Sequence, residues 1–284
     1  MKTAAERLRY YAEHFTTVEV DSTYYRLPDE QMVSRWDERT PDGFVMHVKA
    51  FGMMTRHPVR VEQLPPDLRE GAPVDDRGRI DRPPRELRAE AFARFHAALE
   101  PLRGAGKLGG ILLQFPSYVV AKDLSRDYLA WAVEQLRGDR PLVEFRHRSW
   151  LDDENRAETL AFLEELGAAH VVVDAPKTDA KNLVPTVVAA TSPLAYVRMH
   201  GRNAGTWNVR GGSASDRFDY LYSEDELREW TGPLRELSES AEEVYVLSTN
   251  TRWSRTEKGE LAAQAPANAL ALQGILAESG VPTA

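Results

Sequence analysis

The chain has 284 residues, of which 42% are hydrophobic and 9% aromatic, a composition that supports a sizeable core and argues against disorder. It contains no cysteine, which excludes disulfides, thiolate–zinc sites and cysteine nucleophiles and fits a reducing cytoplasm, where we expect the protein to act. The net charge of −8 disfavours non-specific binding to nucleic acid. No stretch approaches the roughly 20 apolar residues of a membrane span, so we expect no membrane partner.

The chain opens with an amphipathic pattern and then alternates between strands and helices. Apolar residues recur at helical spacing at the start, without the apolar run of a secretory signal: Ala4, Leu8, Tyr11 and Phe15. Short apolar segments predict strands at residues 17–22, 44–51, 109–116, 142–147, 169–175, 194–201 and 242–250. Amphipathic stretches between them predict helices at residues 90–102, 127–136 and 157–166.

Strands that alternate with helices imply a parallel sheet. Units of this kind in one chain predict a TIM-barrel-like (β/α)₈ fold of the α/β class, which usually takes about 250 residues. We therefore expect a single domain over residues 1–284.

One interval, at about residues 52–86, breaks the alternation. It is rich in proline and charge, too irregular for a helix and too long for an ordinary loop. We interpret it as an excursion over the barrel mouth. A lid and a solvated insertion without function are equally open readings.

A glycine-rich stretch, "GAGKLG" at residues 104–109, matches the dinucleotide-binding pattern G-x-G-x-x-G in sequence but not in its predicted structural context. A dinucleotide fingerprint follows a strand and opens a helix, whereas this stretch follows a helix and enters a strand. It is therefore predicted to be a helix end and a turn into the strand. The sequence also lacks a phosphate-binding Walker loop, a G-x-S-x-G elbow and an H-E-x-x-H motif.

Ionisable residues share one face of several predicted strands. In "VEFRHRSW" (143–150), Glu144 and Arg146 alternate with apolar residues, and Arg198 and His200 do the same in a later strand. Other polar residues that lie in strands or end them are Glu19, Asp21, Lys49, Gln114, Asp174 and Asn250. Helices pack on the apolar face, so the polar face should point inward near the strand ends where barrel active sites form.

We expect six of these side chains to converge on one cavity: Glu19, Lys49, Glu144, Arg146, Arg198 and His200. A purely structural network of buried ion pairs is the alternative, because buried charges are costly unless they are paired. Pairing alone would not require polar ends on every strand, which favours a functional site.

Six segments taken together resemble the DUF72 family, also called the YecE-like family. They are "VEVDSTYYRLP", "FVMHVKAF", "KLGGILLQFP", "VEFRHRSW", "YVRMHGR" and "APANAL", and they span nearly the whole chain in order. The resemblance implies a TIM-barrel-like fold and no assigned activity. Members of the family usually begin with a strand similar to "GTSGW", which this chain lacks, so we expect a barrel without its first strand.

The residues at the strand ends suggest an enzyme of hydrolase, lyase or isomerase type. Its substrate would be small, polar and anionic, either sugar-like or phosphorylated. Candidate general acids and bases are Glu19, Asp21, Glu144 and His200, since partly buried carboxylates and imidazoles can titrate near neutrality. Candidate substrate-binding residues are Lys49, Gln114, Arg146, Asp174, Arg198, Arg202 and Asn250.

The segment "MHGRNAGTW" (199–207) is predicted to bind the acidic part of that ligand. Arg198 and Arg202 could grip a phosphate or carboxylate through paired hydrogen bonds, with His200 beside the reacting centre. Alternatively, the glycines only turn the chain and Arg202 is solvated.

A second hypothesis is a protein that binds or processes nucleic acid, with or without a metal. Trp207, Arg202, Arg210 and Arg217 could stack on bases and neutralise phosphates, although the acidic total argues against it. A non-catalytic binding protein is a third possibility. The sequence identifies no reaction, cofactor, metal or oligomeric state.

Overall fold

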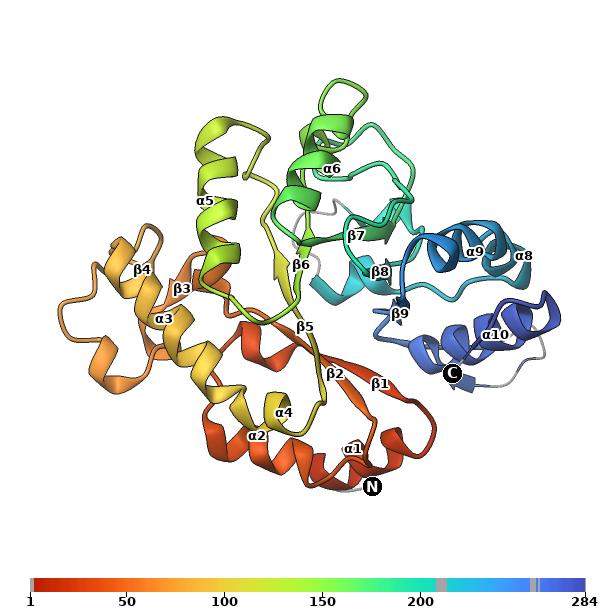
Figure 1. Cartoon of the computed structure of the whole chain (residues 1–284), viewed down its shortest axis with the longest axis horizontal. Helices are drawn as coiled ribbons and strands as arrows, with labels where there is room; N and C mark the ends of the chain where they lie inside the picture. Colours follow the sequence, from red (N-terminus) through yellow and green to blue (C-terminus); the bar gives the residue numbers. More distant parts are fainter. Residues whose placement is uncertain (1–2, 208–213, 256–258, 260, 284) are drawn as a thin grey trace. The chain divides into compact units, whose positions relative to one another are not determined.

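The structure is a computed structural model that describes residues 3–207, 214–255, 259 and 261–283. The chain divides into two compact units, which we call unit 1 (Met1–Pro116 with Lys122–Val143) and unit 2 (Ser117–Ala121 with Glu144–Ala284). Each predicted strand segment overlaps a strand of the structure, and the strands are labelled in Figure 1. Within the described residues, no helix has the length and apolar character needed to cross a membrane.

Unit 1 is built on parallel strands that pair in chain order. β1 (Thr17–Val20) pairs with β2 (Val45–Lys49), and β2 pairs with β5 (Leu108–Gln114). β6 (Pro141–Glu144) follows after α5. The helices of this unit are α1 (Ala4–Ala12), α2 (Glu30–Asp37), α3 (Arg85–Ala98), α4 (Glu100–Gly104) and α5 (Asp123–Glu134). The segment "GAGKLG" forms the turn from α4 into β5, which confirms the predicted helix end and turn into a strand.

The proline-rich and charge-rich interval forms short 3₁₀ turns and a small ribbon. Its turns are η2 (Gly52–Thr55), η3 (Val61–Gln63) and η4 (Pro66–Leu68). β3 (Val59–Arg60) and β4 (Arg79–Ile80) pair antiparallel and bury Val59 and Ile80, which fixes the ribbon to unit 1. An excursion over the barrel mouth and a role as a lid stay predictions.

A bulge between β2 and β5 depends on a glycine. Met46 pairs with Leu108 and His47 pairs with Gly110, so Gly109 is the extra residue. A Cβ atom at Gly109 would lie 2.5 Å from Cε1 of His47 and 2.5 Å from Cγ1 of Val45. His47 is fully buried, so its imidazole cannot move aside without disturbing the packed core.

We therefore expect Gly109→Ala to lower the free energy of unfolding by about 1–3 kcal/mol, the usual cost of overpacking a core. Urea unfolding measures the change. Gly104→Ala is the control, because a Cβ atom there meets nothing within 4 Å. Equal stability of the two variants would contradict the close packing of His47 on Gly109.

Unit 2 contains a second run of parallel strands in chain order. β7 (Ala169–Asp174) pairs with β8 (Leu194–Met199), which pairs with β9 (Glu243–Ser248). The helices of this unit are α6 (Arg156–Glu165), α7 (Ala204–Trp207), α8 (Glu224–Arg228), α9 (Thr231–Ser240) and α10 (Gln264–Glu278). An antiparallel hairpin of β10 (Trp253–Arg255) and β11 (Leu261–Ala263) follows β9.

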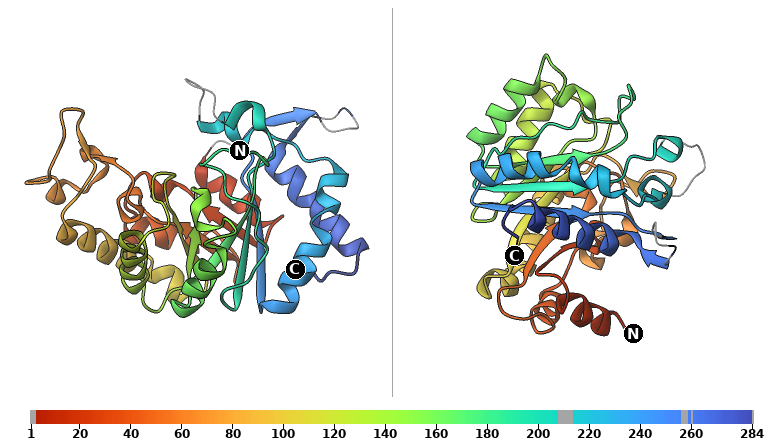
Figure 2. Two further views of the ribbon diagram at one scale, coloured as in Figure 1. Left: turned by 90° about the horizontal axis from the view of Figure 1, so that it is seen from above. Right: turned by 90° about the vertical axis from the view of Figure 1, so that its right-hand side faces the viewer.

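Helices α8, α9 and α10 cover one face of the strands of unit 2 (Figure 2). Val172, Val197 and Met199 point toward this face and pack with apolar residues of the helices, among them Leu227 and Leu272. Because alternate residues of a strand point to opposite faces, Arg198 and His200 point away from these helices.

The connection between β7 and β8 contains no helix in residues 175–193, all of which the structure describes. Side chains tie this segment to β7 instead. Nε2 of His170 contacts the carbonyl oxygen of Val187 at 3.1 Å, and the hydroxyl of Thr186 donates to Val173 at 3.0 Å. The hydroxyl of Thr191 accepts from the backbone N–H of His170 at 2.7 Å.

Candidate functional site

Four of the predicted site residues form one buried cluster in unit 2, which we call the Glu144 cluster: Glu144, Arg146, Arg198 and His200. Oε1 of Glu144 lies 2.5 Å from Nε of Arg146 and 3.1 Å from Nε2 of His200. The other carboxylate oxygen of Glu144 forms an ion pair with Nη1 of Arg198. The end of β6 and the end of β8 thus bring these side chains together, as the alternation predicted.

Charge and burial fix the protonation state of two members of the cluster. Burial alone would raise the pKa of Glu144, but the charges of Arg146 and Arg198 hold it well below its usual value. Burial and the charge of Arg146 lower the pKa of His200 to about 3, against the opposing effect of Glu144. At neutral pH the cluster therefore contains a carboxylate, a neutral imidazole and two guanidinium groups, and its net charge is positive.

Arg146 is the most accessible member of the Glu144 cluster. Its side chain is 17% exposed, compared with 5% for Arg198 and 0% for Glu144 and His200. Its Nε and Nη2 atoms face Glu144 and His200, and the guanidinium carbon lies 5.9 Å from the ring centroid of Trp207. Among the described residues, the contacts of this guanidinium group with Glu144 and His200 use Nε and Nη2, and Nη1 makes no hydrogen bond.

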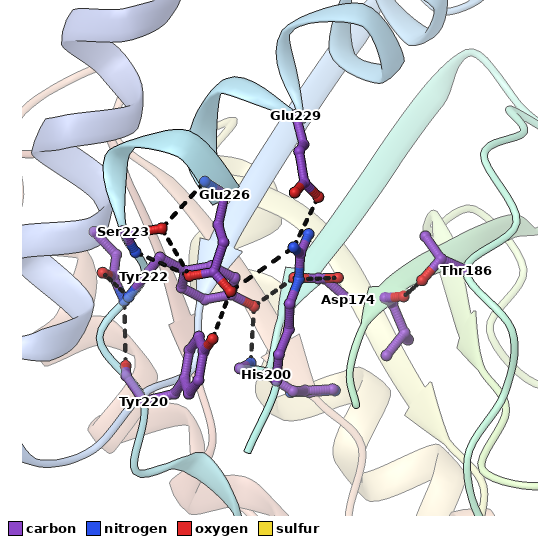
Figure 3. Close-up of polar contacts among 12 residues, drawn as sticks. Asp174, Thr186, His200, Tyr220, Tyr222, Ser223, Glu226 and Glu229 are labelled. Atoms are coloured by element: carbon purple, nitrogen blue, oxygen red, sulfur yellow. Dashed lines mark hydrogen bonds and ion pairs between the residues drawn. The ribbon is translucent and has the colours of Figure 1, made fainter. Parts of the chain in front are cut away.

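A second polar network includes Asp174, Tyr222 and Glu229 (Figure 3), and Arg202 binds Asp174 and Glu229. Nε of Arg202 donates to both carboxylate oxygens of Asp174, at 3.0 and 3.2 Å, and Nη1 donates to Glu229 at 2.7 Å. The phenol of Tyr222 donates to Asp174 at 2.6 Å and accepts from the backbone N–H of Gly201 at 2.9 Å. Burial and the charge of Asp174 raise the pKa of Tyr222, so the phenol keeps its proton.

Asp174 lies on the helix-covered face of the sheet. It pairs in register with Met199 and shares its face with Val172, whereas Arg198 pairs with Val173 on the opposite face. Asp174 and Arg202 therefore belong to a network that fixes the chain after β8, apart from the Glu144 cluster.

Asn250 extends this second network. Its amide nitrogen lies 3.3 Å from the carbonyl oxygens of His200 and Phe218, and its amide oxygen accepts from Asn268 at 3.0 Å. Asn268 also accepts from the backbone N–H of Tyr222 at 3.1 Å. Asn268 is the asparagine of the "APANAL" segment at the start of α10. Through Asn250, this segment helps to fix the backbone at His200.

Unit 1 holds the remaining predicted residues. Nζ of Lys49 lies 2.7 Å from Asp21 and 4.7 Å from the ring centroid of Tyr24. Glu19 pairs in register with His47, and Lys49 pairs with Leu112, two residues before Gln114. Glu19, Lys49 and Gln114 therefore share one face of the strands of unit 1. Convergence of all six predicted residues on one cavity stays a prediction.

The sequence did not single out Thr249, which contacts His200. Its hydroxyl oxygen lies 2.7 Å from Nδ1 of His200. The signal was present, because Thr249 directly precedes Asn250 at the end of a predicted strand. Phe218 was also missed, although its ring centroid lies 5.2 Å from that of His200. Tyr222 lies outside the strands, so the alternation of strand residues could not identify it.

Two features named in the nucleic-acid hypothesis have different outcomes. Arg210 lies outside the described residues. Trp207 is buried, and it lies under Arg146 with its ring centroid 6.4 Å from that of His200.

In the part of the chain that the structure describes, no group of three or more His, Cys, Asp or Glu side chains is arranged to hold a metal ion.

Known proteins agree with this fold. The structure is similar to a crystal structure of a DUF72 family protein from Enterococcus faecalis V583, with a TM-score of 0.77 and 24% identity over 95% of this chain and 88% of that one. It is also similar to a DUF72 family protein from Thermotoga maritima MSB8, with a TM-score of 0.71 and 32% identity over 97% and 90% of the two chains. These likenesses confirm the predicted TIM-barrel-like α/β fold.

Sequence comparison gives the same family. The chain is 33% identical over 255 residues to the UPF0759 protein YunF of Bacillus subtilis (strain 168), which covers 88% of this chain and 82% of that protein. The family model described as "Protein of unknown function DUF72" matches residues 1–283. The resemblance seen in the six sequence segments is thereby confirmed, and the chain belongs to the DUF72 family.

Proposed function

We propose that the protein is an enzyme that binds a small, polar, anionic substrate, sugar-like or phosphorylated, at the Glu144 cluster. The observation that carries this proposal is the position of Arg146. Its guanidinium group contacts Glu144 and His200 through Nε and Nη2, its side chain is partly exposed, and it belongs to a cluster of net positive charge. Arginine in this state can give an anion two parallel charged hydrogen bonds.

Other charges around Arg146 support an anionic ligand. Burial lowers the pKa of Arg146, and the nearby charges of Arg198 and Arg217 lower it further, against Glu144, which raises it. An incoming anion would relieve the repulsion among these three arginines. Arg202 is a weaker candidate than the sequence suggested, because carboxylates of Asp174 and Glu229 already bind its guanidinium group.

The proposed roles follow from the protonation states. Glu144 remains a carboxylate and holds the two arginines in place, so it does not exchange protons near neutral pH. His200 is neutral and is the proton acceptor of the cluster. Proton abstraction of this kind occurs in lyases and isomerases and in the activation of water by hydrolases. Lys49 and Asp21 remain candidates for substrate contact in unit 1.

Untargeted mass spectrometry of ligands that co-purify with the full-length protein tests the substrate class. A phosphorylated or carboxylated metabolite is the expected result. Turnover of that compound should then be lost in His200→Gln, while its binding persists. A neutral or cationic ligand would argue against the proposal.

We expect Arg146→Ala to weaken binding of the identified anion by about 1.5–3 kcal/mol for each charged hydrogen bond lost. Isothermal titration calorimetry measures the change. The control is Arg148→Ala, two residues away, because Arg148 is partly exposed and contacts Asp179 instead of the cluster. If both variants bind the anion as well as the original protein does, with circular dichroism unchanged, Arg146 is not the anion anchor.

A further inference from the structure

The hydroxyl group of Thr249 contacts two groups but has only one proton. Its oxygen lies 3.1 Å from the carbonyl oxygen of Met199 and 2.7 Å from Nδ1 of His200. The carbonyl oxygen of Met199 also accepts from the backbone N–H of Thr249 at 3.1 Å, so the hydroxyl can donate either to Met199 or to Nδ1 of His200. If it donates to Met199, its oxygen accepts from a proton on Nδ1.

Arg146 selects between these two arrangements. Its Nη2 atom lies 3.1 Å from Nε2 of His200. A guanidinium group has donors only, so Nε2 must present a lone pair. A neutral imidazole carries a single ring proton, so the contact with Arg146 places that proton on Nδ1, where Thr249 can accept it.

This arrangement leaves one contact unfavourable. Oε1 of Glu144 and Nε2 of His200 lie 3.1 Å apart, and both are acceptors in this tautomer. Arg146 makes the contact tolerable, because its Nε–H bonds to Glu144 and its Nη2–H bonds to His200. If Arg146 shifts, Nε2 faces a carboxylate that can stabilise a proton on it.

We propose that Thr249 is a positioning residue that keeps the proton of His200 on Nδ1, and that an anion bound by Arg146 releases Nε2 of His200 to accept a proton from the substrate. This inference rests on the proposed function and adds how binding of the substrate makes His200 able to accept a proton. The proton leaves an O–H or C–H group of the substrate, whose electron pair stays on the substrate, and a new N–H bond forms at Nε2. Glu144 becomes the counter-ion of the imidazolium.

The charged groups recorded around His200 make this coupling physically reasonable. They are Glu144, Arg146 and Arg198, and the neighbouring rings of Trp207 and Phe218 are uncharged. Of the three, Glu144 favours the charged imidazole and the two arginines oppose it. An anion on Arg146 weakens the larger opposing charge. The substrate class that fits carries its anionic group close to the proton that it gives up.

The tautomer can be measured in the protein without any ligand. Long-range proton–nitrogen correlations of ¹⁵N-histidine-labelled protein at neutral pH report which ring nitrogen carries the proton, with His200 assigned through His200→Gln. We expect Nδ1–H in the original protein and in Thr249→Ser, and a shift toward Nε2–H in Thr249→Val. Thr186→Val is the control, because Thr186 also donates to a strand carbonyl but does not contact His200. Finding Nε2–H in the original protein would overturn the role of Thr249.

Inorganic phosphate is the probe for the coupling. Phosphate that binds at Arg146 should raise the pKa of His200, followed by the same spectra, by about one unit or more, which is tenfold in proton affinity. Arg146→Ala should abolish this effect. Phosphate that binds at Arg146 without changing His200 overturns the inference and leaves the proposed function standing. Failure of phosphate to bind at Arg146 removes the proposed anion site and the coupling together, whatever the tautomer.

Discussion

Replacement of Glu144 by Gln should lower the free energy of unfolding by about 3–5 kcal/mol, the typical cost of removing one partner of a buried ion pair. Glu144 is completely buried and contacts Arg146, Arg198 and His200. Glutamine has nearly the same shape, so packing is preserved and only the charge is lost. Two guanidinium groups would then remain close together without this carboxylate between them.

Urea unfolding of Glu144→Gln, followed by circular dichroism, measures this effect. Glu229→Gln is a suitable control, because Glu229 also pairs with an arginine but its side chain is 54% exposed. Exposed pairs usually contribute about 0–1 kcal/mol. A loss in Glu144→Gln no larger than the loss in the control would mean that Glu144 does not neutralise the two arginines.

The second large effect is a loss of stability in mild acid that depends on His170. This side chain is buried, its Nε2 contacts the carbonyl oxygen of Val187, and its Nδ1 has no hydrogen-bond partner among the described residues. Burial lowers the pKa of His170 from 6.5 to about 4. The unfolded chain therefore binds a proton at a higher pH than the folded chain does.

The direction of the pH effect follows from this difference. Stability is fully present above pH 6.5, begins to fall as the pH drops through 6.5, and has lost the whole contribution below pH 4. The complete loss is about 3 kcal/mol, of which roughly 2 kcal/mol is lost by about pH 5. His170→Gln keeps a donor for Val187 and does not titrate.

Urea unfolding at neutral pH and near pH 5 tests the prediction. The original protein should lose more stability between the two conditions than His170→Gln does, by roughly 2 kcal/mol. His14→Gln serves as the control, since His14 is exposed. An identical pH dependence for His170→Gln and the original protein would rule out His170 as the source.

The sequence predicted the strands and the Glu144 cluster because both depend on alternation. In the predicted strand segments that contain Arg146 and His200, polar and apolar residues alternate, so the sequence itself shows which residues form the polar face. The helix predicted at residues 127–136 likewise overlaps α5, and the predicted helix at 157–166 overlaps α6. Local patterns were sufficient where each face of an element has a different chemistry.

Alternation failed to place Asp174 because every residue of β7 is buried. His170 and Asp174 share their face with Val172, so the pattern of "AHVVVD" does not show which side the helices cover. Only the pairing with β8 decides that Asp174 lies with Met199. The contacts of Tyr222 and Asn268 with the chain after β8 also escaped prediction, because they join residues far apart in sequence.

The two contacts that hold Arg146, with Glu144 and with His200, also affect the entropy of binding of the proposed anion. A free arginine side chain has many rotamers, and ordering such a chain at an interface costs about 0.5–1.5 kcal/mol. Arg146 is already held by two acceptors along one edge and by the face of Trp207. Much of this freedom is therefore lost when the protein folds, so the proposed anion would meet, at Nη1, a donor whose direction is largely set before it binds. Selection of that anion would then depend on its shape as well as on its charge.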